Sequence, residues 1–214
     1  MISFTADAFF RLVARYNADL WPAVAAGTVL ALAVIVVAAT GRGGGRPVAA
    51  ILALLWLWTG GVFLGRYLSG LFFAAPLPAA LFVLQAGLIA WVGVFRAGLA
   101  FRFRPSARGW AGAVLIAAAV LVHPLTAAAS DFGWADIRGP ATAPAPLTLL
   151  TLGLLLWAEG RVPVILLVVP ALWSLAWGAI AWELRIAEDL ALPAAAVVAC
   201  VLTFLANRNR TGPP

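Results

Sequence analysis

The sequence offers few side chains that could carry out chemistry. Its 214 residues include one histidine, His123, one cysteine, Cys200, and eight acidic residues. A single imidazole and a single thiol exclude a two-histidine metal site, a bis-histidine haem and an internal disulfide. The sequence shows no nucleophile–base pair, metal-ligand set or nucleotide-binding loop, so we expect a protein that is not an enzyme and uses no cofactor.

His123 is nevertheless a candidate functional residue, because it stands directly before Pro124 inside a long apolar segment. An ionisable side chain deep in a bilayer is costly, and imidazole is the usual proton carrier. The alternative is a neutral ring that bonds a backbone carbonyl, including one that the proline frees. The sequence leaves both interpretations open.

Acidic residues on the same predicted side of the membrane could complete a proton or cation path with His123. These residues are Asp131, Asp136, Glu188 and Asp189. Glu183 is a further candidate polar residue, which could pair with Arg185 or with neighbouring loops. Glu188 and Asp189 also precede Pro193 at the expected start of a helix, where negative charge interacts favourably with the helix dipole. A structural role at that helix end is therefore the competing interpretation for these two acids.

A basic segment interleaves arginines with phenylalanines and reads FRAGLAFRFRPSAR from Phe95 to Arg108. Its arginines are Arg96, Arg102, Arg104 and Arg108. Near an anionic membrane surface each basic residue contributes about 1 kcal/mol, so these side chains are candidate contacts for anionic lipid. The competing interpretation is an interfacial anchor without a specific ligand.

Two tryptophans, Trp173 and Trp177, are four residues apart in an apolar segment. Residues at this spacing lie on one face of a helix, so a flat apolar ligand such as a quinone could stack against them. Packing between helices is the competing interpretation, because an indole N–H can bond a carbonyl there.

The composition indicates what must position these residues. Hydrophobic residues make up 64% of the chain and charged residues 10%, and the mean hydropathy is +1.04. A soluble domain could not cover its surface with so few polar groups, and the chain is too apolar to be disordered. We therefore expect an integral membrane protein with the lipid bilayer as a partner, and an all-α bundle of membrane-spanning helices.

Seven apolar segments are candidates for crossing the membrane, because about 20 helical residues span the hydrocarbon core. They are residues 20–40, 47–65, 79–95, 110–129, 146–158, 162–182 and 190–206. The segment 146–158 is short, and it could cross as a thin helix or return as a re-entrant hairpin. With seven crossings the arginines divide nine against five, and without this crossing seven against seven. Since arginine collects on the cytoplasmic side, the uneven division favours seven crossings.

This topology places the N-terminus outside and the C-terminus in the cytoplasm. Residues 1–19 are predicted to form an interfacial amphipathic helix, in which Phe9, Val13 and Tyr16 share one face. Residues 20–206 form a single transmembrane domain, and 207–214 a short cytoplasmic tail. The formal net charge of +6 is then explained by orientation in the membrane, so nucleic acid is not an expected partner.

Five strings along the chain carry a resemblance to a known family. They are ARYNADLWPA (14–23), LWLWTGG (55–61), TLGLLL (151–156), PALWSLAWG (170–178) and EDLAL (188–192). In their order they resemble an uncharacterised family of small bacterial multi-pass membrane proteins, the domain-of-unknown-function family numbered sixty sixty-four. Some of its members carry permease labels, so the resemblance implies a permease-like protein of the bacterial cytoplasmic (inner) membrane.

We therefore expect a permease-like protein that moves a small solute or a proton, or assists a partner that does, with His123 and the outer acids at its mouth. The competing expectation is a structural or accessory subunit of a membrane protein complex. Other membrane proteins or a second copy of the chain would then be its partners.

Overall fold

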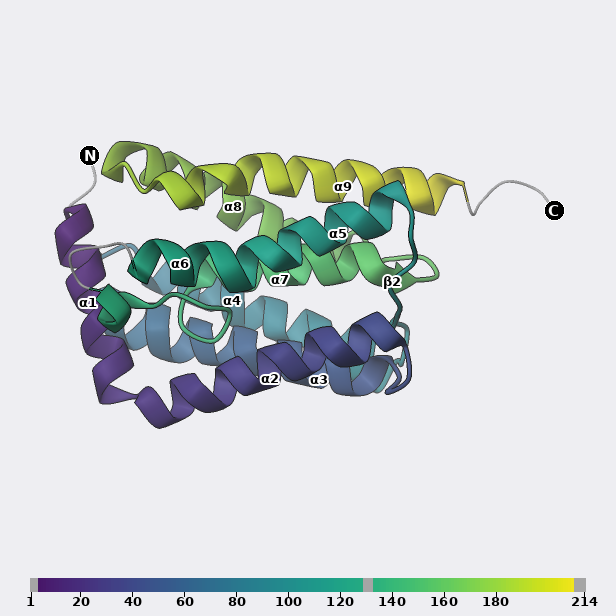
Figure 1. Cartoon of the computed structure of the whole chain (residues 1–214), viewed down its shortest axis with the longest axis horizontal. Helices are drawn as coiled ribbons and strands as arrows, with labels where there is room; N and C mark the ends of the chain where they lie inside the picture. Colours follow the sequence, from purple (N-terminus) through teal and green to yellow (C-terminus); the bar gives the residue numbers. More distant parts are fainter. Residues whose placement is uncertain (1–3, 129–132, 210–214) are drawn as a thin grey trace.

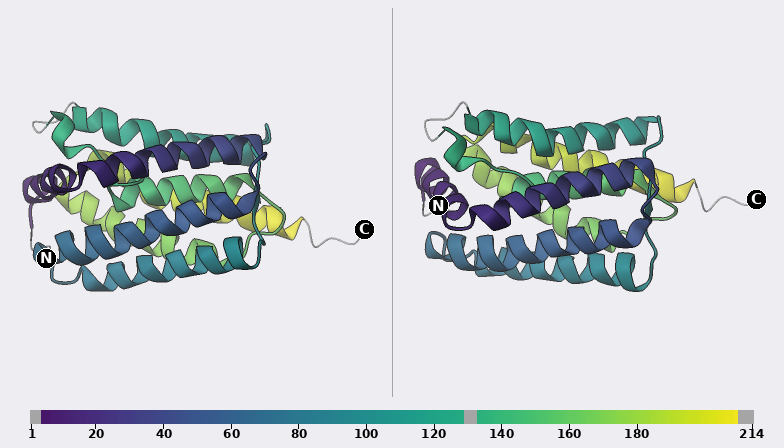
Figure 2. Two further views of the ribbon diagram at one scale, coloured as in Figure 1. Left: turned by 90° about the horizontal axis from the view of Figure 1, so that it is seen from below. Right: turned by 60° about the horizontal axis from the view of Figure 1, so that its bottom comes forward.

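The helices of the computed structural model form an elongated bundle, and residues 4–128 and 133–209 are described (Figure 1). Helix α1 (Ala6–Asp19) lies across one end of the bundle, and the longer helices run between that end and the other (Figures 1 and 2). The opposite end carries two short antiparallel strands, β1 (Ala100–Phe101) and β2 (Ala158–Glu159). We call these the α1 end and the β end.

Within the described residues, six helical segments are long and apolar enough to cross a membrane. They are α2 (Trp21–Thr40); α3 (Gly45–Trp58) with η1 (Thr59–Tyr67) and η2 (Leu68–Gly70); α4 (Pro76–Ile89) with η3 (Ala90–Phe95); α5 (Ala107–Ala117) with η4 (Ala118–Val122) and α6 (His123–Ala128); α8 (Ile165–Leu184); and η6 (Ala187–Ala191) with α9 (Leu192–Arg208). Each coincides with a predicted apolar segment. The all-α fold class is confirmed, and these helices are compatible with a membrane location.

The remaining predicted segment, residues 146–158, corresponds to α7 (Pro144–Trp157), which has 14 residues, all of them buried. At 1.5 Å per residue this helix is about 21 Å long, less than the roughly 30 Å of a hydrocarbon core. Residues 138–143 before α7 are buried as well. The buried stretch that contains α7 is therefore longer than α7 itself. Helix α7 alone is too short to count as a seventh membrane-spanning helix.

The start of α7 is buried without a side-chain cap. The first four N–H groups of a helix have no partner within the helix, which makes a buried helix start costly. Pro144 and Pro146 reduce this cost, because proline has no N–H to satisfy. The proline-rich sequence therefore allows the chain to begin a helix inside the bundle.

Two glycines bring the backbones of α5 and α7 together. A Cβ atom on Gly153 would lie 2.7 Å from the carbonyl oxygen of Gly112, and one on Gly112 would lie 2.7 Å from the carbonyl oxygen of Gly153. The Trp157 indole N–H donates to the carbonyl of Gly109 over 2.9 Å and joins the same two helices. Small residues at such a crossing are typical of helices that pack without a hydrophobic driving force.

Helix α1 closes the α1 end of the bundle. Its buried residues include Phe9, Val13 and Tyr16, the residues predicted to share a face. The Phe9 ring centroid is 5.1 Å from that of Trp177, and the Tyr16 centroid is 5.2 Å from that of Phe63. The apolar face of α1 therefore packs on the ends of the long helices.

Candidate functional site

Four ionisable side chains from distant parts of the sequence meet near the α1 end. They are His123 at the start of α6, Arg138 before α7, and Glu188 and Asp189 in η6, and we call them the charged cluster. His123 and Asp189 are each 1% exposed and Arg138 is 3% exposed. Ionisable groups buried to this degree in an apolar bundle must be stabilised by one another.

Both ring nitrogens of His123 face oxygen atoms. Nε2 lies 2.8 Å from Oδ1 of Asp189, and Nδ1 lies 3.4 Å from the carbonyl oxygen of Ala118. A neutral imidazole can donate from one nitrogen only, whereas the protonated ring can donate from both. A ring that carries both N–H groups could therefore donate to both oxygen atoms.

The local backbone explains why the Ala118 carbonyl faces His123. Residues Ala118–Val122 form the π-helical segment η4, directly before His123 and Pro124. In a π helix each carbonyl points toward the residue five positions later, which for Ala118 is His123, and π turns are frequent at functional sites. The ring of His123 thus faces both a carbonyl oxygen and a carboxylate oxygen.

Arg138 supplies the other positive charge of the cluster. Its Nη2 forms an ion pair with Glu188, and its Nη1 lies 3.9 Å from Oδ2 of Asp189. The guanidinium also lies 4.9 Å from the centroid of the Phe10 ring on α1. The Trp177 indole N–H donates to Oδ2 of Asp189 over 2.7 Å, so both oxygens of this carboxylate have partners.

The charges of the cluster balance when His123 is protonated. His123 and Arg138 are then positive, and Glu188 and Asp189 are negative. Loss of the proton from His123 would leave one net negative charge on these four groups, in a site that is buried and hence unfavourable for an unbalanced charge. The cluster is therefore suited to binding one proton or one other positive charge.

A cavity of about 420 Å³ gives access to the cluster between α5–α6 and η6–α9. Its wall includes His123 and Glu188, and its other lining residues are alanine, valine and leucine. The Glu188 side chain is 11% exposed and is therefore more accessible than that of its ion-pair partner Arg138. The apolar cavity is thus in contact with the polar groups of the cluster.

Polar residues of α1 hold the segment that carries Arg138. The Asn17 side-chain amide donates to the carbonyls of Ala135 and Ile137, each over 2.9 Å. The Trp58 indole N–H donates to the Tyr16 hydroxyl over 2.6 Å, and that hydroxyl lies 3.5 Å from the carbonyl oxygen of Ala141. Burial raises the pKa of Tyr16 to about 12, so its hydroxyl stays protonated in the physiological range.

The structure brings together three of the six predicted polar candidates, His123, Glu188 and Asp189. Asp136 is buried in η5 (Gly133–Asp136), and Glu183 is exposed near the end of α8. Asp131 lies outside the described residues. Within the described part of the chain, no group of three His, Cys, Asp or Glu residues is placed to hold a metal ion.

Sequence reasoning missed Arg138 and Trp177 as members of the site. From the sequence, Arg138 is only one of the five arginines on the predicted outer side, and Trp177 is expected to pack between helices or to stack a ligand. A signal for Arg138 was present, because it is the only arginine in the long connection between residues 131 and 146. Its burial depends on the fold of that connection, which no local pattern reveals.

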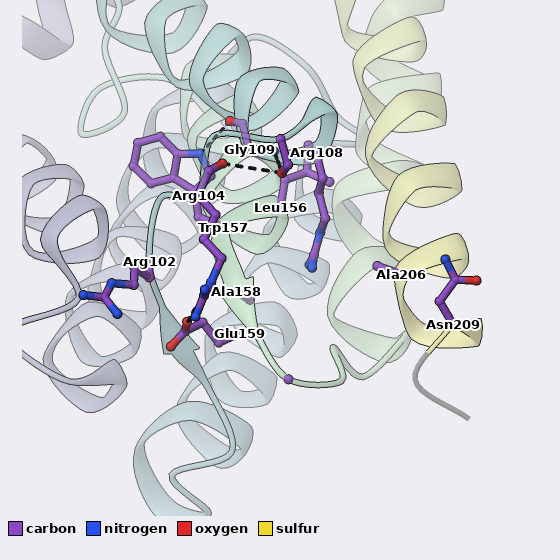
Figure 3. A pocket seen from close by; sticks show the side chains of 12 residues that line it. Arg102, Arg104, Arg108, Gly109, Leu156, Trp157, Ala158, Glu159, Ala206 and Asn209 are labelled. Atoms are coloured by element: carbon purple, nitrogen blue, oxygen red, sulfur yellow. Dashed lines mark hydrogen bonds and ion pairs between the residues drawn. The ribbon is translucent and has the colours of Figure 1, made fainter. Parts of the chain in front are cut away.

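The predicted lipid contacts lie at the β end. Arg102, Arg104 and Arg108 line a cavity of about 460 Å³, which Figure 3 shows from close by. Arg96 does not belong to its lining and lies with its guanidinium 5.4 Å from the centroid of the Trp91 ring. The structure therefore divides the four arginines into three around a cavity and one outside it.

Comparison with known proteins gives a family without an assigned activity. The model of a family of unknown function, DUF6064, matches residues 6–212. No curated protein and no solved structure matches the chain. The family match includes every element that contributes to the charged cluster and to the arginine-lined cavity.

Proposed function

We propose that this chain, which belongs to the DUF6064 family of unknown function, is a permease-like integral membrane protein. It would move a small solute or a proton, and this activity is inferred from its own residues. The six apolar helices support a membrane location. The charged cluster is its protonatable element.

The contact between His123 and Asp189 carries this proposal. Their 2.8 Å separation lies inside a bundle of apolar helices, where ionisable side chains are rare and mark ion and proton pathways. The cavity that reaches His123 and Glu188 supplies a route to the pair. A proton on His123 neutralises the cluster, and its departure favours the uptake of another proton or of a cationic solute.

The proposed topology has seven crossings, with the N-terminus outside and the C-terminus in the cytoplasm of a bacterial cell. The fifth crossing consists of the buried residues 138–143 followed by α7. Two contacts support it, because Ala141 lies beside Tyr16 of α1 and β2 pairs with β1 at the other end. The bias of arginine toward the β end supports the orientation. The charged cluster then lies on the outer side.

Proton flux into proteoliposomes tests the function. A pH gradient is imposed on vesicles that hold the purified protein and an internal pH-sensitive dye. We expect His123→Gln to lower the protein-dependent flux at least about tenfold, because the amide can still bond Asp189 but cannot carry a proton. Glu183→Gln is the matched control, since Glu183 is an exposed acid near the same end, and its flux should equal that of the unaltered protein. Equal fluxes for His123→Gln and the unaltered protein would refute the proposal.

A structural or accessory subunit is the second candidate. The cluster joins α6, the segment before α7, and η6, and Arg138 also contacts α1 through Phe10. Contacts that join these elements could serve the stability of the fold alone. In that case the unaltered protein would show no flux above that of empty vesicles, a stable membrane protein partner would co-purify with it, and His123→Gln would lower its thermal stability.

A further inference from the structure

The cavity at the β end lies among three elements. It is bounded by the connection from β1 to α5 with the start of α5, by the end of α7 with β2, and by the last turns of α9 (Figure 3). Arg102, Arg104, Arg108, Trp157, Glu159 and Ala206 are among its lining residues. Three positive charges against one negative charge give this lining an excess of positive charge.

Two of the arginines are held in place by the protein. Arg104 forms an ion pair with Glu159, with Nη2 2.5 Å and Nε 3.2 Å from Oε1. Arg108 donates from Nη2 to the carbonyl of Leu155 over 2.9 Å. In Figure 3 the Arg108 side chain extends from α5 between the labelled residues of α7 and those of α9. Guanidinium groups held in this way lose little further freedom when they bind an anion.

The start of helix α5 adds to the positive potential. Ser106 caps this helix by accepting from the Gly109 N–H over 3.1 Å, and both residues line the cavity. The N-terminus of a helix carries a partial positive charge that stabilises phosphate and other anions. Arg104 and Arg108 stand beside this helix start, so an anion in the cavity would interact with all three.

Apolar side chains on the same helices indicate what the anion is attached to. Trp110 on α5 follows the lining residue Gly109, and Leu205 on α9 precedes the lining residue Ala206, and both side chains are exposed. Leu156 and Ala206 contribute apolar wall to the cavity itself. A ligand with a phosphate head and hydrocarbon tails matches both parts of this surface, whereas inorganic phosphate matches only the charged part.

We propose that this cavity binds the phosphate headgroup of an anionic phospholipid, whose acyl chains lie along the exposed faces of α5 and α9. Basic pockets between spanning helices on the cytoplasmic side are suited to such headgroups. The inference is independent of the proton path, because no residue of the charged cluster takes part in it.

Lipid binding to the purified protein in detergent tests this proposal. Native mass spectrometry would measure the apparent affinity for phosphatidylglycerol, with phosphatidylcholine and inorganic phosphate as the other probes. We expect Arg104→Gln and Arg108→Gln each to weaken phosphatidylglycerol binding about tenfold, because each removes a charge-assisted hydrogen bond. Arg96→Gln is the matched control. It removes the same charge from the same basic segment outside the cavity, so its binding should change less than about twofold.

A neutral variant separates the cavity from surface charge. Ala206→Phe fills the cavity without altering the charge of the chain and should also weaken phosphatidylglycerol binding about tenfold. This variant decides the question if Arg108→Gln fails to fold. An equal loss in Arg96→Gln, or full binding in Ala206→Phe, would show diffuse surface attraction and overturn the proposal. Inorganic phosphate that competes fully with phosphatidylglycerol at equal concentration would also overturn it, in favour of a soluble phosphate ligand.

Discussion

Arg138 determines the charge balance of the site at the scale of single residues. Its positive charge offsets the repulsion between the neighbouring carboxylates of Glu188 and Asp189. The Arg138 side chain is itself nearly inaccessible to solvent. The residue types of His123, Glu188 and Asp189 were enough to select them from the sequence. Arg138 could not be selected, since its role follows from the burial of the chain before α7.

Removal of Arg138 should destabilise the protein strongly. Arg138→Met leaves Glu188 without its ion-pair partner, and we expect a loss of about 3–5 kcal/mol in the free energy of unfolding. The double variant Arg138→Met, Glu188→Gln should lose less than the single variant, because it leaves one buried negative charge fewer. Circular dichroism during denaturation in mixed micelles would measure both changes.

A surface arginine provides the control for this comparison. Arg15 lies 3.5 Å from Asp19 on the exposed face of α1, and Arg15→Met should cost no more than about 1 kcal/mol. Equal losses for Arg15→Met and Arg138→Met would contradict the account of the cluster. An even larger loss in the double variant would contradict it as well.

At the scale of elements, hydropathy located six long helices to within a few residues. Each contains an apolar stretch long enough to be recognised without knowledge of its neighbours. Helix α7 is different, because it is short and its burial depends on the six helices around it. The close approach of α5 to α7 could not be predicted from the sequence either. Nothing in the residues around Gly112 and Gly153 indicates that these two glycines contact each other.

The surroundings of Gly153 and Gly87 predict opposite effects on stability when each is replaced by alanine. A Cβ at position 153 would lie 2.7 Å from the Gly112 carbonyl oxygen and from Cγ1 of Ile116, so Gly153→Ala should cost about 1–3 kcal/mol. Gly87 in α4 has open space around its Cβ position, and Gly87→Ala should gain up to about 1 kcal/mol from helix propensity. Thermal unfolding in one detergent would compare the two. A Gly153→Ala protein as stable as Gly87→Ala would contradict the close helix crossing.

At the scale of the whole molecule, the connections between the long helices gather at the two ends of the bundle. The connections at residues 41–44, 96–106 and 158–163 gather at the β end, whereas α1, residues 133–137 and residues 185–187 gather at the α1 end (Figure 1). The seven crossings predicted from the distribution of arginine would divide the connections in the same way, because charge bias and chain direction are both readable from sequence. The contacts within each end could not be predicted, since they join loops that are far apart in the chain.

The central claim is that the charged cluster faces the outside and the arginine-lined cavity faces the cytoplasm, with the chain crossing the membrane between them at α7. Cysteine labelling of intact cells tests it most directly. The chain has a single cysteine, so Cys200→Ser gives a background in which Ala135→Cys and Arg161→Cys, both at exposed positions flanking α7, can be labelled one at a time.

The account predicts that a membrane-impermeant maleimide labels Ala135→Cys in intact cells. Arg161→Cys should be labelled only after the membrane is opened, and both variants should react fully in opened membranes. Labelling of both positions from outside would show that α7 and the residues before it do not cross. Labelling of Arg161→Cys alone in intact cells would show that the protein is inserted the other way up.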